Sequence, residues 1–381
     1  MTTEPHRAPE AFWPDLLTRV SAGGDLSPAQ AEAAMAEVLT GDVSDARLAG
    51  LLMGLRAKGE SPSEVAAFAQ VLLAHAVRID LADLALPAAF SAGQSCRSAT
   101  VVDVVGTGGD GARTANISTT AAFVVAACGV PVLKHGNRAV SSRAGAFDLI
   151  EALGIAVADT PAALRADLQR HGCALCFAPH FHPALRHAGQ VRRELGVRTV
   201  FNTLGPLVNP GQPPGSVLGA ASPQQAEAMA AVLAGQGRSG LVVCSQDGLD
   251  EFSPEAPTRT WAVIGGDVTV AEVTPHSLGR QPRPAGGLRG GTPTHNAEVT
   301  RAVLDPTQPC PRGGAWGETD IDTVREVVAV TAAAALAVAS AIDEGETTGK
   351  GLLARIPGSI PVAWEALATG RAAAVLAAIG P

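Results

Sequence analysis

The feature that most constrains the fold is a strand, a glycine-rich loop and a helix in immediate succession. An apolar run at Val101–Val105 leads into Gly106-Thr-Gly-Gly-Asp-Gly111, and the apolar residues of Ile117–Cys128 predict a helix. Val130–Leu133 then predicts another strand. A strand, a helix and a second strand in this order are typical of a parallel sheet covered by helices. The sequence therefore predicts an α/β domain.

The first quarter of the chain has a different pattern, in which apolar residues recur at helical spacing. Helices are predicted at Ala29–Leu39, Asp45–Arg56 and Ser63–Val77, and residues 14–90 show no strand pattern. Ser27 before Pro28, like Ser61 before Pro62, is typical of a helix N-cap followed by proline in the first turn. We therefore expect a small helical N-terminal domain over residues 1–95 and a larger α/β domain, with a mainly parallel central sheet, over residues 96–381.

The later part of the chain continues the α/β pattern with fewer clear signals. Leu241–Cys244 predicts a further strand, and helices are predicted at Phe147–Leu153, Val324–Asp343 and Val362–Leu376. The glycines and prolines of Gly279–Thr294 predict a surface loop.

Charge and hydropathy limit the class of partner. The net charge is −8, without the basic excess that nucleic-acid binding usually requires, so no nucleic-acid partner is expected. The apolar stretch Val327–Ile342 falls short of the roughly 20 residues of a membrane span. The first residues show no basic segment followed by an apolar one, so we expect a cytoplasmic protein without a membrane partner.

Cys173 and Cys176 form a CxxC pattern that must be weighed against a metal or redox site. The stretch that contains them has the composition of a buried strand. Positions three apart in a strand point to opposite faces, so the two thiols would not converge on one ion. A core strand with reduced cysteines is the favoured interpretation.

The glycine-rich loop and the residues after it predict an anion site. Glycines let the backbone approach a ligand closely, and free N–H groups at a helix start face an anion. A tight turn without a ligand remains the alternative for the loop. Asn116 and Ser118 at the helix start have two interpretations, an ordinary N-cap, which these residues alone favour, or ligands of the anion or its metal.

Lys134-His-Gly-Asn-Arg138 follows the second predicted strand, at the edge where parallel sheets bind ligands. The chain has three lysines, so a lysine at this position is notable, and a compact ammonium suits a phosphate oxygen. Ser141 and Ser142 supply hydroxyls before the next predicted helix, which indicates a second anion cradle.

Two further groups of charged residues have open interpretations. Arg192 could bind a carboxylate in a two-pronged manner, or lie with Arg193 on a solvated helix face. Asp250 and Glu251 follow a predicted strand. They could be solvated loop residues, or hold Mg²⁺ if they face the glycine-rich loop.

Taken in order, these motifs, together with Phe201-Asn-Thr-Leu-Gly-Pro-Leu-Val-Asn-Pro210, resemble the anthranilate phosphoribosyltransferase family over roughly residues 14–380. The Lys-His-Gly-Asn-Arg and Leu-Gly-Pro-Leu stretches are the most specific. The glycine-rich loop is shared with pyrimidine nucleoside phosphorylases of the same fold. The resemblance implies the nucleoside phosphorylase and phosphoribosyltransferase type of fold, in which part of residues 183–212 joins the helical domain, and a homodimer.

The resemblance also implies an activity: transfer of the phosphoribosyl group from phosphoribosyl pyrophosphate (PRPP) to the amine of anthranilate, in tryptophan biosynthesis, with Mg²⁺ as cofactor. It implies that PRPP is bound by Gly106, Gly109, Asp110, Thr114, Asn116, Ile117, Ser118, Thr119, Lys134, His135, Gly136, Asn137, Arg138, Ala139, Val140, Ser141, Ser142 and Ala146. Anthranilate would be held by Gly106, Asn137 and Arg192, with His135, Ala178, Pro179, Gly205 and Pro206 along its path. Mg²⁺ would be held by Ser118, Asp250 and Glu251.

The chemistry of this reaction needs alignment and stabilisation of the leaving pyrophosphate more than proton transfer. The aromatic amine is already neutral near pH 7, so no residue is assigned as a general base. Ala146 departs from the family, because many members have serine there, and any contact at this position is through the backbone. Two alternatives are kept: a pyrimidine nucleoside phosphorylase of the same fold, and a non-catalytic nucleic-acid-binding paralogue.

Overall fold

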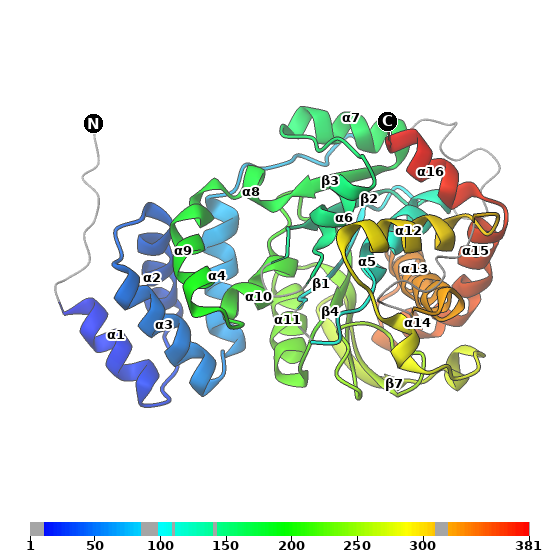
Figure 1. The fold of residues 1–381 in the computed structure, drawn as a ribbon. Coiled ribbons are helices and arrows are strands. Elements are labelled where there is room, and N and C mark those ends of the chain that lie inside the picture. The colour runs from blue at the N-terminus through cyan, green and yellow to red at the C-terminus, as the bar shows by residue number, and fades with distance from the viewer. Residues whose placement is uncertain (1–10, 85–97, 109–110, 140–142, 309–318, 381) are drawn as a thin grey trace.

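The computed structural model describes residues 11–84, 98–108, 111–139, 143–308 and 319–380. Five of the predicted site residues lie outside these ranges, namely Gly109, Asp110, Val140, Ser141 and Ser142. Two lobes are visible in Figure 1, a helical domain that begins with α1 and a larger α/β domain built on a central sheet. The predicted fold class is confirmed.

The helical domain begins with four helices, α1 (Phe12–Ser21), α2 (Pro28–Thr40), α3 (Asp45–Lys58) and α4 (Pro62–Ala74). Ser27 and Ser61 cap α2 and α4 as predicted, and each forms a reciprocal capping box with the residue three positions later. The carboxylate of Glu64 completes one of these boxes and also accepts the backbone N–H of Leu26 at 2.8 Å. Local sequence signals therefore account for both helix starts.

The central sheet has seven strands in the order β3-β2-β1-β4-β5-β6-β7. The strands are β1 (Val102–Gly106), β2 (Val132–Gly136), β3 (Cys173–Phe177), β4 (Gly215–Gly219), β5 (Ser239–Ser245), β6 (Thr258–Ile264) and β7 (Asp267–Val273). All pairings from β3 to β5 are parallel, and β6 and β7 are antiparallel to their neighbours. The sheet is mainly parallel, as predicted.

Helices cover both faces of the sheet (Figure 1). In the α/β domain these are α5 (Ile117–Ala127), α6 (Ala146–Ala152), α7 (Pro161–His171), α11 (Pro223–Gly235), α12 (Pro293–Leu304), α13 (Ile321–Asp343), α14 (Gly349–Ala354), α15 (Ile356–Ala368) and α16 (Arg371–Ile379). The segments between β3 and β4 are α8 (Ala178–Phe181), η2 (Pro183–Leu185), α9 (Arg186–Leu195), α10 (Val200–Leu204) and η3 (Gly205–Leu207). Of these, α9 contacts α2 and α3, and α10 contacts α3 and α4.

Alternate residues of each strand enter different apolar clusters, as a pleated sheet with two covered faces requires. Val102 and Val104 belong to the cluster formed with α5 and α13, whereas Val105 belongs to the cluster that includes α4 and α11. Cys173 and Cys176 also lie in different clusters. The argument that the CxxC thiols point to opposite faces is therefore confirmed.

Helix α13 is longer than predicted, and it is long and apolar enough to cross a membrane by length and composition alone. Of its apolar 18-residue window, 83% is buried within the protein. It contacts β4, β5, α5 and α15, so its hydropathy reflects a position in the core.

Two predictions about the later elements need correction, and one element was missed. The predicted final helix Val362–Leu376 is two helices, α15 and α16, which meet at 64° around Gly370. The hairpin of β6 and β7, which turns at Gly265 and Gly266, was not predicted. Residues 279–294 are not simply a surface loop: they contain η5 (Ala285–Leu288), and Leu288 is fully buried.

Candidate functional site

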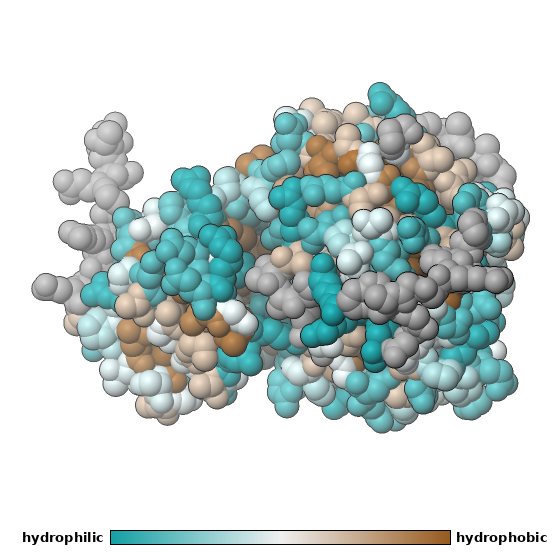
Figure 2. Space-filling model, in the orientation of Figure 1, coloured by the Kyte–Doolittle hydropathy of each residue, from teal (hydrophilic) through white to brown (hydrophobic). Residues whose placement is uncertain are grey.

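A cavity of about 540 Å³ lies between the helical and α/β domains, at the carboxyl ends of β1 and β2. The two domains form two lobes with a narrower waist between them (Figure 2). All described residues of the predicted PRPP, anthranilate and metal sets line this cavity, namely Gly106, Thr114, Asn116, Ile117, Ser118, Thr119, Lys134, His135, Gly136, Asn137, Arg138, Ala139, Ala146, Arg192, Asp250 and Glu251. Ala178, Gly205 and Pro206 line it as well, but Pro179 does not.

The glycine-rich loop is in direct contact with Asp250. The backbone N–H of Gly108 donates to Asp250 Oδ2 at 2.7 Å. A Cβ atom on Gly106 would lie 2.5 Å from the same oxygen, closer than non-bonded atoms approach. Glycine at position 106 is therefore required for the acidic loop to reach the end of β1.

Asp250 and Glu251 are both buried, at 6% and 8% exposure, in the loop that follows β5. They line the same cavity as Ser118, which lies in the first turn of α5. Two adjacent buried carboxylates are costly unless a cation compensates their charge, and carboxylate and hydroxyl oxygens suit Mg²⁺. Within the described residues no group of three His, Cys, Asp or Glu side chains could hold a metal. The donor set fits a Mg²⁺ ion that keeps water or ligand phosphates as its other ligands.

The start of α5 lacks the side-chain N-cap that the sequence favoured for Asn116 or Ser118. Asn116 occupies the N-cap position, but its side chain makes no capping bond. Instead, its Nδ2 donates to the carbonyl of Ala144 at 3.2 Å, and its Oδ1 accepts from Asn296 Nδ2 at 2.8 Å. Neither Asn116 nor Ser118 is therefore an ordinary N-cap, and the first turn of α5 faces the cavity without a side-chain cap.

Thr119 presents an unused hydroxyl near the same turn. Its residue is buried, and its Oγ1 has no hydrogen-bond partner within the described part of the chain. Buried hydroxyls usually find a partner, so an orphaned one beside a cavity is a reason to expect a polar ligand.

Lys134 is turned into the sheet. Its Nζ donates to the carbonyl of Val104 at 2.8 Å and to that of His135 at 3.3 Å, and the residue is 1% exposed. Burial lowers the pKa of Lys134, and the nearby carboxylates of Asp103 and Glu251 oppose that shift. The predicted contact between Lys134 and a phosphate oxygen stays a prediction.

His135 lies between the two domains and is held neutral. Burial lowers its pKa to about 3, and the neighbouring His182 contributes to the shift. Its Nδ1 lies 3.1 Å from the carbonyl of Gly205, which fixes the proton on that nitrogen. With its pKa this low, His135 is neutral near pH 7 and does not supply an imidazolium ion to the reaction.

The two adjacent arginines of α9 have different environments. The guanidinium of Arg192 stacks over the ring of Phe201, with Cζ 4.9 Å from the ring centroid. In the described part of the structure no carboxylate lies at ion-pair distance from Arg192, whereas Arg193 and Glu194 are exposed. Burial lowers the pKa of Arg192. A guanidinium with one face on an aromatic ring and its edge on a cavity suits a planar carboxylate.

The loop after β2 is closed by a residue that the sequence did not reveal. Asp148 Oδ2 accepts the backbone N–H of Ala139 at 2.8 Å and that of Gly145 at 2.7 Å. Arg138 forms an ion pair with Glu151 and stacks over Phe177. Asp148 therefore holds both described ends of this loop through their backbone N–H groups, and Arg138 is anchored at the rim of the cavity.

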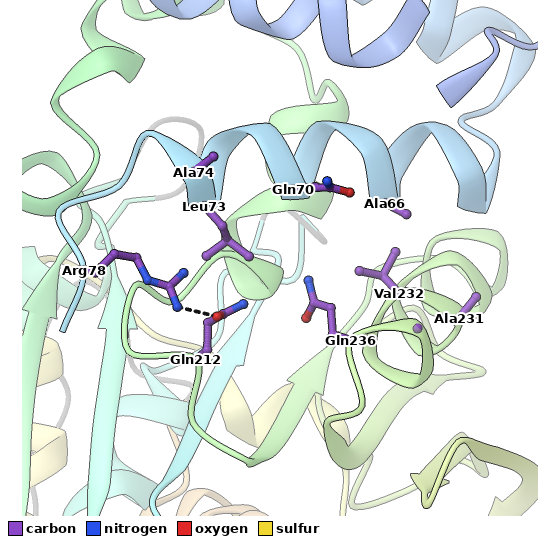
Figure 3. Close-up of a pocket in the computed structure, with 10 residues that line it drawn as sticks. Ala66, Gln70, Leu73, Ala74, Arg78, Gln212, Ala231, Val232 and Gln236 are labelled. Atoms are coloured by element: carbon purple, nitrogen blue, oxygen red, sulfur yellow. Dashed lines mark hydrogen bonds between the residues drawn. The ribbon is translucent and has the colours of Figure 1, made fainter. Parts of the chain in front are cut away.

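A second hollow, of about 510 Å³, lies elsewhere between α4 and α11. Figure 3 shows Gln70 and Gln236 facing each other across it, and Arg78 hydrogen-bonded to Gln212. Among the described residues that line it, there is no acidic, cysteine or histidine side chain. It therefore lacks the groups of the first cavity.

Comparison with known proteins gives a consistent assignment. Residues 98–373 match the glycosyl transferase family, a/b domain, and residues 14–76 match the glycosyl transferase family, helical bundle domain. The anthranilate phosphoribosyltransferase of Thermomicrobium roseum is 47% identical over 330 residues, which cover 86% of this chain and 87% of that protein.

Solved structures support the same family assignment. The crystal structure of anthranilate phosphoribosyltransferase from Thermus thermophilus has a TM-score of 0.77 at 36% identity, and the match covers 95% of this chain and 97% of that one. The Saccharomyces cerevisiae enzyme in complex with PRPP and Mg has the same fold, with a TM-score of 0.77 at 24% identity over 98% of each chain. With its two matched domains, its high-coverage relatives and the cavity between its domains, this chain belongs to the anthranilate phosphoribosyltransferase family of glycosyl transferases.

Proposed function

We propose that this protein transfers the phosphoribosyl group of PRPP to the amine of anthranilate, which gives N-(5-phosphoribosyl)anthranilate and pyrophosphate. One observation carries the proposal. Residues from four separate segments, namely the glycine-rich loop, the end of β2, α9 and the loop after β5, line a single cavity between the two domains. Family membership makes this reaction, a step of tryptophan biosynthesis, the first to test.

The two ends of the cavity suit the two substrates. The uncapped first turn of α5 and the orphaned hydroxyl of Thr119 are suited to the phosphates of PRPP. Arg192, stacked on Phe201, is suited to the carboxylate of anthranilate. Holding both substrates at once converts a bimolecular reaction into an oriented one.

The reaction breaks the bond between the anomeric carbon and pyrophosphate and forms a carbon–nitrogen bond. Mg²⁺, held by Ser118, Asp250 and Glu251, would supply charge stabilisation for the departing pyrophosphate. The amine is neutral and loses one proton to solvent as the bond forms. His135 is neutral and hydrogen-bonded to Gly205, so we assign it to the PRPP side of the junction with the anthranilate path and name no general base.

Three finer features are part of the same proposal. We propose Mg²⁺ as the cofactor, because the oxygen donors of Ser118, Asp250 and Glu251 suit it. We propose a homodimer in the cytoplasm, without nucleic-acid or membrane partners. We also propose that residues 1–95, joined by part of 183–212, form the helical domain and residues 96–381 the other.

The test follows the fluorescence of anthranilate in a mixture of protein, PRPP and Mg²⁺. A loss of signal that requires all three components would support both the reaction and the metal. No loss with a folded protein would overturn the proposal, and release of base from thymidine or uridine with phosphate would then indicate a nucleoside phosphorylase.

A further inference from the structure

The parallel strands β1 and β2 separate towards the cavity. Within these two described strands the register pairs Val102 with Val132 alone. By contrast, β1 pairs with β4 at every position from Val102 to Gly106, and β2 pairs with β3 at every position from Val132 to Gly136. The sheet is therefore open between β1 and β2 where the site begins.

Side chains take over the hydrogen bonding across this opening. Lys134 Nζ donates to the carbonyl of Val104, from β2 to β1. In the other direction, Asp103 Oδ1 accepts the backbone N–H of His135 at 3.2 Å. Buried backbone N–H and C=O groups need hydrogen-bond partners, so these side-chain contacts replace bonds that the separated strands do not form with each other.

Asn209 joins the opening to the segment that returns from the helical domain. It lies between η3 and β4, and it is fully buried, as is Asp103. Its Nδ2 donates to Asp103 Oδ2 and to the carbonyl of Leu133, each at 2.9 Å. Its Oδ1 accepts the backbone N–H of Gly211 at 3.0 Å. One side chain therefore connects β1, β2 and the returning segment.

Two buried cations, Lys134 and Arg238, lie near the carboxyl group of Asp103. Burial raises the pKa of Asp103, while Lys134, the hydrogen bonds from Asn209 and His135, and Arg238 oppose that shift. Arg238 Nη2 in turn donates to Ser216 Oγ at 2.6 Å on β4. Removing one member of such a buried network leaves the others unpaired, which is costly.

We propose that Asp103 and Asn209 are positioning residues that fix the PRPP half of the cavity against the anthranilate half. Lys134 and His135 belong to the first half, and Gly205 and Pro206, on the returning segment just before Asn209, line the second. The contact between His135 Nδ1 and the Gly205 carbonyl lies across the same junction. This assignment of the two halves rests on the proposed function.

The expected kinetic effect is on turnover rather than on PRPP binding. Asn209→Ala removes the donor to Asp103 and Leu133, so the two halves can shift relative to each other. Misplacement of about 1 Å can cost about 100-fold in rate, so kcat should fall by about 10- to 100-fold. PRPP is expected to bind within the α/β domain, so its KM should change by less than about threefold. A residue that only stabilises the fold would lower the melting temperature and leave kcat per folded molecule unchanged.

An exchange of the two side chains tests the contact itself. Asn209→Asp places two carboxylates together in a buried site, which is strongly unfavourable. Adding Asp103→Asn restores an N–H···O bond with donor and acceptor reversed. It also leaves one carboxylate near Lys134, the same number as in the wild type. The double variant should have a kcat about tenfold above that of Asn209→Asp, although the bond to Leu133 is not restored. A double variant no better than Asn209→Asp would overturn the proposal.

Two controls separate this idea from loss of folding and from an error in the proposed function. Val328→Ala removes buried volume in α13, outside the cavity lining, and should lower the melting temperature without changing kcat.

Hydrogen exchange in the free protein is independent of the reaction. Asn209→Ala should accelerate exchange at the amides of His135 and Gly211 but not in α13. If the wild-type protein is inactive but Asn209→Ala still shows this change in exchange, only the proposed function is refuted. Unchanged exchange at both amides in Asn209→Ala would refute the positioning role.

Discussion

The amide nitrogen of Gly108 lies 2.7 Å from Oδ2 of Asp250, although 142 residues separate the two in the sequence. This contact places the acidic loop after β5 directly against the glycine-rich loop after β1. An anion held by the glycine-rich loop and a cation held by the acidic pair would therefore be neighbours.

Gly106→Ala should displace Asp250 from its place. The added Cβ would lie 2.5 Å from Asp250 Oδ2, so the carboxylate must move and the contact with Gly108 is lost. Turnover should fall by about 100-fold if Asp250 holds the metal, a size typical for one lost electrostatic contact in a site. The measurement is kcat with saturating substrates. Gly235→Ala is the control, because nothing lies within 4 Å of its added Cβ, and its activity should equal that of the wild type.

Asp250→Asn combined with Glu251→Gln should weaken Mg²⁺ binding. The double variant keeps the shape of both side chains but removes two negative charges from the cavity that Ser118 also lines. The Mg²⁺ concentration for half-maximal activity should rise by at least about tenfold, and residual turnover should be low. Asp267→Asn combined with Glu272→Gln, at two exposed positions of β7, is the control with the same change of charge. A Mg²⁺ titration identical to that of the wild type would rule out the metal assignment.

Arg192→Ala should act on anthranilate and spare PRPP. A charged hydrogen-bonding partner contributes about 1.5–3 kcal/mol, so the KM for anthranilate should rise by about 10- to 100-fold. The neighbouring Arg193 is exposed and supplies a matched control, since Arg193→Ala removes the same charge from the same helix. Steady-state kinetics with each substrate varied in turn would decide. Equal effects on both substrates would contradict a carboxylate contact.

The buried neutral state of His135 predicts a dependence of stability on pH. Its pKa is about 3 when folded, against an ordinary value of 6.5, so the unfolded chain binds the extra proton between these values. The stabilisation is fully present above about pH 6.5 and is lost as the pH falls towards 3, by about 2 kcal/mol at pH 5. His135→Asn keeps an N–H for the Gly205 carbonyl but cannot be protonated. Urea unfolding at pH 5 and pH 7.5 should show a smaller difference for this variant than for the wild type, and equal differences would exclude His135 as the cause.

The elements that were predicted correctly carry local signals strong enough to outweigh their surroundings. Ser27 and Ser61 start helices by hydrogen bonds to residues three positions away, and the alternation in β3 separates Cys173 from Cys176 whatever lies around them. The position of the cavity also followed from topology, because the carboxyl ends of parallel strands share one edge.

The errors have a common physical cause, which is that a distant partner decides the geometry. Asn116 has the composition of an N-cap, but Asn296, 180 residues away, takes its side-chain oxygen. The predicted phosphate contact of Lys134 stays a prediction, but the hydrogen bond from its ammonium to the carbonyl of Val104 on β1 also depends on a residue 30 positions away. The roles of Asp103 and Asn209 depend on the same kind of long-range contact, so spacing in the sequence did not reveal them.

One missed element did carry a local signal. Gly265 and Gly266, both with positive φ, lie between two runs of alternating residues, and two glycines at such a place are a hairpin turn signal. The break between the two final helices also carried a local signal, which is Gly370. Its backbone lies in the left-handed region just after α15, where glycine commonly ends a helix.

The packing of α9 and α10 against α2, α3 and α4 has a consequence for synthesis of the chain. Val191, Phe201 and Leu204 fill the same apolar cluster as Leu51 and Phe68, so the first four helices cannot complete their core alone. During translation the helical domain can therefore close only after residue 204 has left the ribosome, when β1, β2 and β3 have already emerged. A fragment that ends near residue 76 would expose the apolar surface that α9 and α10 cover, and we expect it to aggregate rather than fold.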